Sequence, residues 1–321
     1  MLELLSGIAL IAATLIASRA SSTIDLHRFA LCWIGVLLAL DGGSRFFRGR
    51  SPLATFGDWV SCAAASLLFW DVFELVDLRL SDWWYTGVSP SALWSGLFGA
   101  LCFATVLPAV RLLVGPLQLP PAQNRPLRLA AGVVMLLAAL AFPRAAFALA
   151  WIFLWPICEA LASVRVPLRL MPLGIPLGLL WESLNYGCRR GWVYTVPHFE
   201  HPKLFEMPLA GYLGYLPFLL EAVAALALLD KLRPYLRGGR GAAALGAVLL
   251  LHFAVDQLGR RKTDVSFAPY DERGVPQSVL TLERATHMGL PRAERVALHG
   301  WESLDDPPEL VRVWIEKANS R

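Results

Sequence analysis

Nine apolar segments separated by short polar loops make up the first 258 residues of the chain. The segments lie at about residues 2–18, 24–40, 54–76, 91–114, 128–142, 145–163, 172–186, 208–230 and 241–258. Most of them approach the roughly 20 residues that a helix needs to cross a bilayer. Only Pro143-Arg144 separates the fifth segment from the sixth, so these two form either a pair of tight spans or a re-entrant hairpin. The pattern predicts an all-α, polytopic membrane helical bundle over residues 1–258, with eight or nine spans.

The composition agrees with this class of protein. Of the 321 residues, 56% are hydrophobic, and the mean hydropathy is +0.52. One soluble core would not bury so much apolar sequence. The first segment carries Glu3 and has no basic n-region, which argues against a cleaved signal peptide and for a retained first span.

Arginine and lysine gather in alternate loops, at Arg45, Arg48 and Arg50, at Arg111, Arg125 and Arg128, at Arg165 and Arg169, and at Lys231, Arg233, Arg237 and Arg240. Loops rich in these residues face the cytoplasm. The intervening loops should then lie on the opposite side. Nine spans would also place Arg260-Arg261-Lys262 on that side, contrary to the rule, so the side of the C-terminal tail stays open.

A polar motif occurs twice, each time at the end of an apolar segment. Glu74-x-x-Asp77 precedes Trp83-Trp84-Tyr85, and Glu182-x-x-Asn185 precedes Trp192-Val193-Tyr194. Leu107-Pro108 and Leu216-Pro217 follow the two tyrosines at the same distance. The pattern predicts an internal duplication, with repeat units at about 54–114 and 163–230.

The repeated motif carries the candidate chemistry. Its polar residues are three apart, which places each pair on one face of a helix, and Asp71 extends the first face inward. Ionisable groups at membrane depth are costly and mark functional sites. We therefore predict that Glu74 and Glu182 are catalytic carboxyl groups at the interface of the repeats, and that the substrate is bound by Asp77, Asn185, Trp84, Tyr85, Trp192 and Tyr194. The alternative for the aromatic residues is the headgroup belt.

A third acid, Glu206, lies in Phe205-Glu206-Met207-Pro208, and alignment of the repeats places it opposite Leu97. Loss of this acid from one copy would make the second repeat the active half and the first its scaffold, with Glu206 as another catalytic residue. The equal alternative is that Glu206 only favours the positive end of the following helix.

Histidines suggest two weaker sites. His198-Phe199-Glu200-His201 lies in the second aromatic loop, and His252 and Asp256 are four residues apart in the last segment. Neither spacing matches a specific metal motif, so we predict no metal. We expect His252 and Asp256 to form a buried pair inside the bundle, with a carboxylate of another helix facing the pair. The sequence contains no G-x-x-x-x-G-K-[ST], G-x-S-x-G or H-E-x-x-H motif, and no cofactor is predicted.

The chain changes character at residues 259–321, where charged and polar residues predominate. Three short helices are expected, at Val279 to Met288, from Pro291 to His299, and from Asp306 to Ala318. This soluble module resembles a helix-hairpin-helix. Nucleic acid is disfavoured as its partner because acidic residues offset the basic ones, so residues 279–318 are predicted to bind a protein or to pack.

The motifs carry a family resemblance. Trp181-Glu182 through Asn185, Trp192-x-Tyr194 and Phe205-Glu206-Met207-Pro208-Leu209 resemble a family of bacterial multispanning proteins with a helix-hairpin-helix-like tail. More distantly they resemble the integral-membrane lycopene cyclase domain, which is also duplicated or heterodimeric and has an acid before a W-x-Y element and then a P-x-E-E element. This chain departs from that pattern because Met207, and not a second acid, follows Glu206.

The resemblance implies an enzyme of the bacterial cytoplasmic (inner) membrane, in which a buried carboxyl of Glu182 or Glu206 protonates a double bond of a lipid-like or isoprenoid substrate. Aromatic rings would stabilise the resulting cation. Such a cyclase or isomerase would have membrane lipids as its surroundings and would need no cofactor. Two alternatives remain, a proton-coupled transporter and a membrane scaffold that recruits a partner through its C-terminal module.

Overall fold

A computed structural model describes residues 2–80, 82–86, 88, 91–188, 190–194, 196, 198, 202–205, 207–260 and 264–265. Three predictions lie outside these residues: the helices of the C-terminal module, its binding of a partner at 279–318, and the role of Glu206. The backbone of Trp84 is described, whereas its side chain is not.

The described part of the chain is mostly helical. The α-helices are α1 (Leu2–Ala17), α2 (Ser22–Leu26), α3 (Arg28–Arg48), α4 (Phe56–Leu80), α5 (Ala92–Phe103), α6 (Val106–Val114), α7 (Arg125–Ala141), α8 (Leu154–Ala162), α9 (Gly174–Asn185), α10 (Tyr215–Leu232) and α11 (Gly239–Arg260). Short 3-10 helices are η1 (Phe147–Trp151), η2 (Leu168–Leu173), η3 (Leu209–Gly214) and η4 (Arg233–Tyr235). The strands are β1 (Trp83–Thr86), β2 (Gly191–Tyr194), β3 (Lys203–Leu204), β4 (Met207–Pro208) and β5 (Asp264–Val265).

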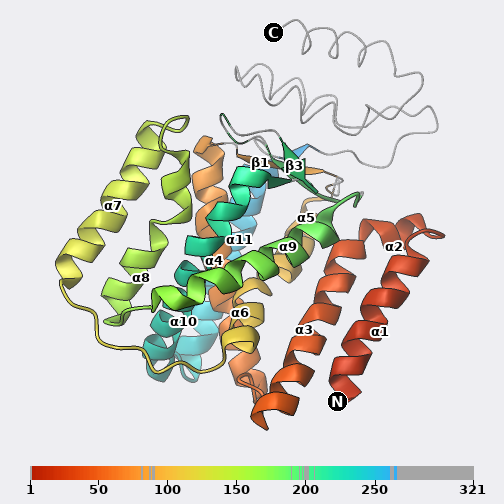
Figure 1. The fold of residues 1–321 in the computed structure, drawn as a ribbon, viewed down its shortest axis with the longest axis horizontal. Coiled ribbons are helices and arrows are strands. Elements are labelled where there is room, and N and C mark those ends of the chain that lie inside the picture. The colour runs from red at the N-terminus through yellow and green to blue at the C-terminus, as the bar shows by residue number, and fades with distance from the viewer. Residues whose placement is uncertain are drawn as a thin grey trace, which may run out of the picture.

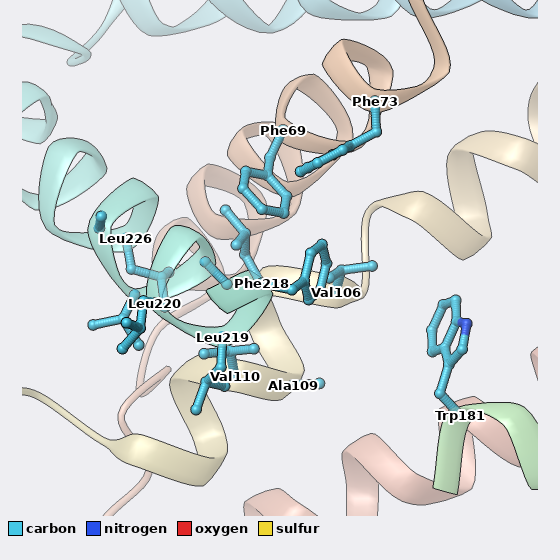
Figure 2. Packing of buried hydrophobic residues seen from close by; sticks show 14 of the residues in the cluster. Phe69, Phe73, Val106, Ala109, Val110, Trp181, Phe218, Leu219, Leu220 and Leu226 are labelled. Carbon is cyan, nitrogen blue, oxygen red and sulfur yellow. The ribbon is translucent and has the colours of Figure 1, made fainter. Parts of the chain in front are cut away.

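Helices α4 and α10 lie in the middle of the bundle (Figure 1). The pair α1 and α3 forms one edge, and α7 and α8 form the opposite edge. Helix α11 packs on α4 and α5. Figure 2 shows the apolar centre, where Phe69 and Phe73 of α4 lie beside Phe218 of α10, and Val110 of α6 lies beside Leu219.

Five helical segments are long and apolar enough to cross a membrane. They are Arg28–Arg48, Phe56–Leu80, Ala92–Val114, Leu209–Tyr235 and Gly239–Gly259. Leu2–Ala17 and Phe147–Ala162 are apolar but shorter, and α9 has only 12 residues. The chain is therefore a multi-pass membrane protein by the length and composition of its helices, with five spanning candidates among the described residues where the sequence predicts eight or nine.

One of the five segments is interrupted where α5 ends and α6 begins. Backbone groups freed by such a break must be satisfied internally, because lipid offers no hydrogen bonds. The buried Ser66 of α4 meets this need: its hydroxyl donates to the carbonyl of Phe103 at 2.5 Å and accepts from the amide of Leu107 at 3.0 Å. Pro108 lies in the first turn of α6, where proline is tolerated.

The basic loops lie at one end of the bundle, which we call the basic end. Arg48 donates to the carbonyls of Leu112 and Leu113, at 2.8 and 2.6 Å, so the ends of α3 and α6 are joined. Arg111 binds both carboxylate oxygens of Asp230 at 2.7 Å, which joins α6 to α10. Lys231 donates to the carbonyl of Leu161 at 2.7 Å, which joins the end of α10 to the end of α8. Arg233, directly after α10, forms an ion pair with Asp58 at the start of α4.

The expectation of an all-α protein is wrong in one respect. The W-x-Y elements are short strands at the end of the bundle away from the basic loops, and they pair in a three-stranded sheet of order β2-β1-β5. Strands β3 and β4 form a second, two-stranded sheet. A period-2 pattern cannot be recognised in only four residues, so the sequence carried no signal for these strands.

Candidate functional site

Pairing of β1 with β2 brings the two W-x-Y motifs together. The strands are antiparallel, with Trp83 opposite Tyr194 and Tyr85 opposite Trp192. The first tryptophan of each motif, Trp83 or Trp192, therefore lies opposite the tyrosine of the other motif. Because β1 follows α4 and β2 follows α9, the pairing also draws together the ends of the two helices that carry the acidic residues.

The carboxylate of Glu74 is held by two aromatic donors. Its Oε1 accepts the hydroxyl proton of Tyr85 and the indole Nε1–H of Trp70, the latter at 2.7 Å. Trp70 and Glu74 are four residues apart on α4, so the helix places them on one face. Glu74 is buried.

The carboxylate of Glu182 has a matching environment. Its Oε1 accepts from the hydroxyl of Tyr194 at 2.8 Å and from that of Tyr215 at 2.5 Å. The Tyr194 hydroxyl in turn accepts from the indole of Trp192 at 2.9 Å. Glu182 is fully buried. Each acid is thus hydrogen-bonded to the tyrosine of its own W-x-Y motif.

Two glycines let Tyr215 reach Glu182. Gly174, Gly178 and Glu182 are spaced by four and share one face of α9. A Cβ atom added at Gly178 would lie 2.4 Å from the ring of Tyr215, and one added at Gly174 would lie 2.0 Å from the Tyr215 carbonyl oxygen. Only the absence of side chains allows α10 to approach α9 so closely.

The predicted substrate contacts Asp77 and Asn185 bind backbone. Asn185 accepts from the amide of Trp192 at 3.1 Å and donates to its carbonyl at 2.8 Å. Asp77 accepts from the amide of Asp82 at 2.7 Å, just before β1. Neither residue lines the cavities described next. Both instead fasten a W-x-Y strand to the end of its helix.

A cavity of about 100 Å³, counted as space open to the centre of a water molecule, lies where α4, α5 and α11 meet β1 and β2. Glu74 and Asp71 line it, whereas Glu182 lies behind Tyr194. Ten of its lining residues are aromatic: Phe29, Trp70, Trp83, Tyr85, Phe98, Phe103, Trp151, Trp181, Trp192 and Tyr194. The space exceeds that of a single water several-fold.

A second cavity of about 50 Å³ lies behind the first, between α9 and α10. The two cavities share four aromatic residues, namely Trp70, Trp151, Trp181 and Tyr194. Tyr215 lines the second cavity only. The tyrosines that bind Glu182 therefore separate this carboxylate from both cavities.

His252 and Asp71 form a buried pair in the wall of the first cavity. His252 Nδ1 lies 2.9 Å from Asp71 Oδ1, and Nε2 lies 2.9 Å from the carbonyl oxygen of Gly96. A carbonyl can only accept, so Nε2 carries a proton and Nδ1 is the nitrogen that shares one with Asp71. The Oδ2 atom of Asp71 is buried and has no partner among the described residues.

The pairing of His252 corrects one expectation from the sequence. Asp256, four residues along α11, accepts from the hydroxyl of Ser95 at 3.1 Å and is not the partner of His252. The sequence placed a carboxylate of another helix only opposite the expected His252–Asp256 pair, whereas Asp71 of α4 is itself the carboxylate that binds His252. Asp71 and His252 are 181 residues apart, so only the packing of α11 on α4 selects this pair.

The two tyrosines of the W-x-Y strands remain protonated. Burial holds the pKa of Tyr85 well above its usual value, and the charge of Glu74 adds to the effect. Burial and Glu182 act on the pKa of Tyr194 in the same way. Each hydroxyl therefore keeps its proton at neutral pH and stays a hydrogen-bond donor to Oε1 of its acid.

Arg190 lines the cavity beside this pair of strands. Its guanidinium lies 4.5 Å from the ring centroid of Phe98, a cation–π arrangement, and burial lowers its pKa. His198, in contrast, is exposed and lies 3.1 Å from the carbonyl of Arg144. Within the described ranges, no group of three His, Cys, Asp or Glu side chains is arranged to hold a metal ion.

No protein-family model, no curated protein and no solved structure matches this chain.

Proposed function

We propose that this chain is a membrane enzyme that protonates a double bond of an apolar, isoprenoid-like substrate and returns the proton after ring closure or isomerisation. The observation that carries the proposal is a carboxyl group, Glu74, in the wall of a cavity that ten aromatic residues also line. A membrane scaffold would need no cavity between the two acidic motifs.

The proposed step conserves atoms and electrons. The protonated Glu74 donates its proton to one carbon of the double bond, and the other carbon becomes a carbocation. The π electrons of a second double bond form the new ring bond, and loss of a proton to the carboxylate restores the acid. The indole rings of the cavity stabilise the cation through their π faces. No redox cofactor is required.

The two acids have different roles in this proposal. Glu74 is the proton donor because it reaches the cavity, whereas Glu182 acts through the hydroxyl of Tyr194, which lines both cavities. Glu182 thereby orients Tyr194. One of two equal interpretations of Glu206 in the sequence made the second repeat the active half, and this assignment moves the chemistry to the first repeat.

We also propose that the two motifs descend from one duplicated unit of the bacterial inner membrane. The register of β1 with β2 supports this, because Trp83 pairs with Tyr194 and Tyr85 with Trp192. A two-fold axis between Trp84 and Val193 would exchange these two pairs. Internal repeats in membrane proteins commonly build their sites at such an axis.

The test is mass spectrometry of lipid extracts from cells that lack the chain and are complemented with wild type, Glu74→Gln or Glu182→Gln. We expect a precursor to accumulate in the deletion, wild type to remove it, Glu74→Gln to leave it unchanged, and Glu182→Gln to remove it slowly. Host cells that accumulate a linear polyene supply a second, defined substrate. A lipid profile that does not change between deletion and wild type would overturn the proposal.

Glu221→Gln is the matched control. Glu221 of α10 is also a fully buried carboxylate, but it accepts from the amide of Leu154 at 2.9 Å and lines neither cavity. Glutamine retains that acceptor. Equal loss of activity in Glu221→Gln and Glu74→Gln would mean that buried charge supports folding in general and that Glu74 has no special part in the chemistry.

A proton-coupled transporter is the second candidate, and the Asp71–His252 pair is the observation that favours it. A buried pair that shares one proton is a suitable element of a relay. Transport predicts proton uptake into proteoliposomes together with a solute, whereas the enzyme predicts a changed lipid and no proton flux. The two hypotheses separate on that measurement.

A further inference from the structure

A long apolar groove runs between α4, α10 and α11 toward the basic end of the bundle. Its volume is about 590 Å³, within the range of about 300–1,000 Å³ typical of ligand sites. Small residues such as Gly57, Ala64 and Gly241 leave the space open, and leucines such as Leu228 and Leu245 form its walls. None of the lining residues is charged.

Four cations follow one another where α10 ends and α11 begins. Two are engaged within the protein, since Lys231 binds the carbonyl of Leu161 and Arg233 pairs with Asp58. Arg237 and Arg240 are exposed, and neither is hydrogen-bonded or ion-paired to another residue in the described part of the chain. They are sequence neighbours of Leu236, Gly238 and Gly241, all of which line the groove.

We propose that the groove binds an acyl chain of an anionic glycerophospholipid, with the phosphate at Arg237 and Arg240. The uncharged walls suit a hydrocarbon chain, and the cations lie at the end of the groove where the headgroup of such a lipid would lie. Basic residues next to a membrane span attract the anionic lipids of the cytoplasmic leaflet. This site is remote from the acids at the opposite end of α4, so it is independent of the function proposed above.

Lipid is a better occupant than the rest of this chain. Residues 266–321 follow the C-terminal end of α11, whereas the groove is lined by the N-terminal half of the same helix. Residues 266–321 are also rich in charged and polar residues, which do not match walls without charge. The third possible occupant, a second copy of the chain, is an outcome of the test below.

The test is native mass spectrometry of the full chain, purified in mild detergent, stripped of lipid and titrated with phosphatidylglycerol or phosphatidylcholine. The double variant Arg237→Gln, Arg240→Gln removes the two exposed cations. We expect wild type to bind phosphatidylglycerol in preference to phosphatidylcholine by about fivefold for each cation, and the variant to bind both equally.

Two matched controls separate the groove from the general charge and surface of the protein. Arg165→Gln, Arg169→Gln removes two exposed cations from another loop of the basic end and should leave the preference intact. Ala244→Phe fills the groove and should reduce the binding of both lipids, whereas Ala247→Phe, on the exposed side of α11, should not.

Three results would overturn the proposal. Wild type that binds the two lipids equally would remove the role of the cations, and equal losses in both arginine double variants would mean non-specific attraction. A wild-type dimer that becomes monomeric in Ala244→Phe, with unchanged lipid binding, would assign the groove to a second copy of the chain.

Discussion

The buried pair of Asp71 and His252 leads to a quantitative prediction. The carbonyl of Gly96 keeps a proton on Nε2, so Nδ1 depends on Asp71 alone for its hydrogen bond. Asp71→Ala removes that partner from a nitrogen inside the bundle. Asp71→Asn keeps a hydrogen-bond partner for Nδ1, because the amide of asparagine can donate to this nitrogen when it is neutral.

The expected magnitudes follow from these contacts. A buried polar group that loses its partner costs about 1–3 kcal/mol, so Asp71→Ala should destabilise the bundle by that amount. For a domain of this size, each kcal/mol lowers the melting temperature by about 2–4 °C. The melting temperature should therefore fall by about 2–12 °C in Asp71→Ala. A neutral hydrogen bond is about half as strong as a charge-assisted one, so Asp71→Asn should lose about 1 kcal/mol at most.

The assay is thermal unfolding in a single detergent, with tryptophan fluorescence as the readout. Wild type, Asp71→Ala, His252→Ala and the double variant form a double-mutant cycle. Two residues in contact should show a coupling energy of about 0.5–3 kcal/mol. The double variant should then melt close to the less stable single variant. Additive losses, or an Asp71→Asn variant as unstable as Asp71→Ala, would refute the inference that one proton is shared between these side chains.

Three further predictions concern the support of the acidic motifs. Gly178→Ala should push the ring of Tyr215 from α9 and cost about 1–3 kcal/mol, measured as thermal stability, whereas Gly43→Ala, where an added Cβ meets nothing within 4 Å, should be nearly neutral. Asn185→Ala should cost about 2 kcal/mol because it removes two hydrogen bonds to β2, and faster hydrogen exchange confined to that strand would show it. Ser66→Ala should cost about 1–3 kcal/mol, since it leaves the buried amide of Leu107 and the partly buried carbonyl of Phe103 without this partner at the break between α5 and α6. Unchanged stability would mean that water replaces the hydroxyl.

Much of the site could be anticipated from residue type and position. Glu74 and Glu182 are acids inside apolar segments, and such groups must find partners or a function. Tyr85, Trp192 and Tyr194 were assigned to the same site, and the structure places all three in the wall of one cavity with Glu74. The spacing of the motif carried this information because it is local to one helix and the loop that follows.

Other features depended on contacts that the sequence does not encode locally. Tyr215 binds Glu182 across 33 residues, and no motif marked it as a partner. Asp77 and Asn185 looked like substrate ligands from their place beside the acids, yet they hold the strand backbone. A helix face predicts which residues lie together, but the direction in which each polar atom finds its partner depends on the neighbouring loop.

The sequence by itself determined the class of the protein and the position of its polar motifs, because hydrophobicity and helical spacing act over a few neighbouring residues. Only the tertiary structure decided which acid reaches a cavity, which carboxylate pairs with His252, and how the W-x-Y elements meet. These outcomes depend on side chains up to 181 residues apart that are brought within 3 Å by helix packing. The glycines of α9 illustrate the reason, since their role is to leave space for a tyrosine that belongs to another helix.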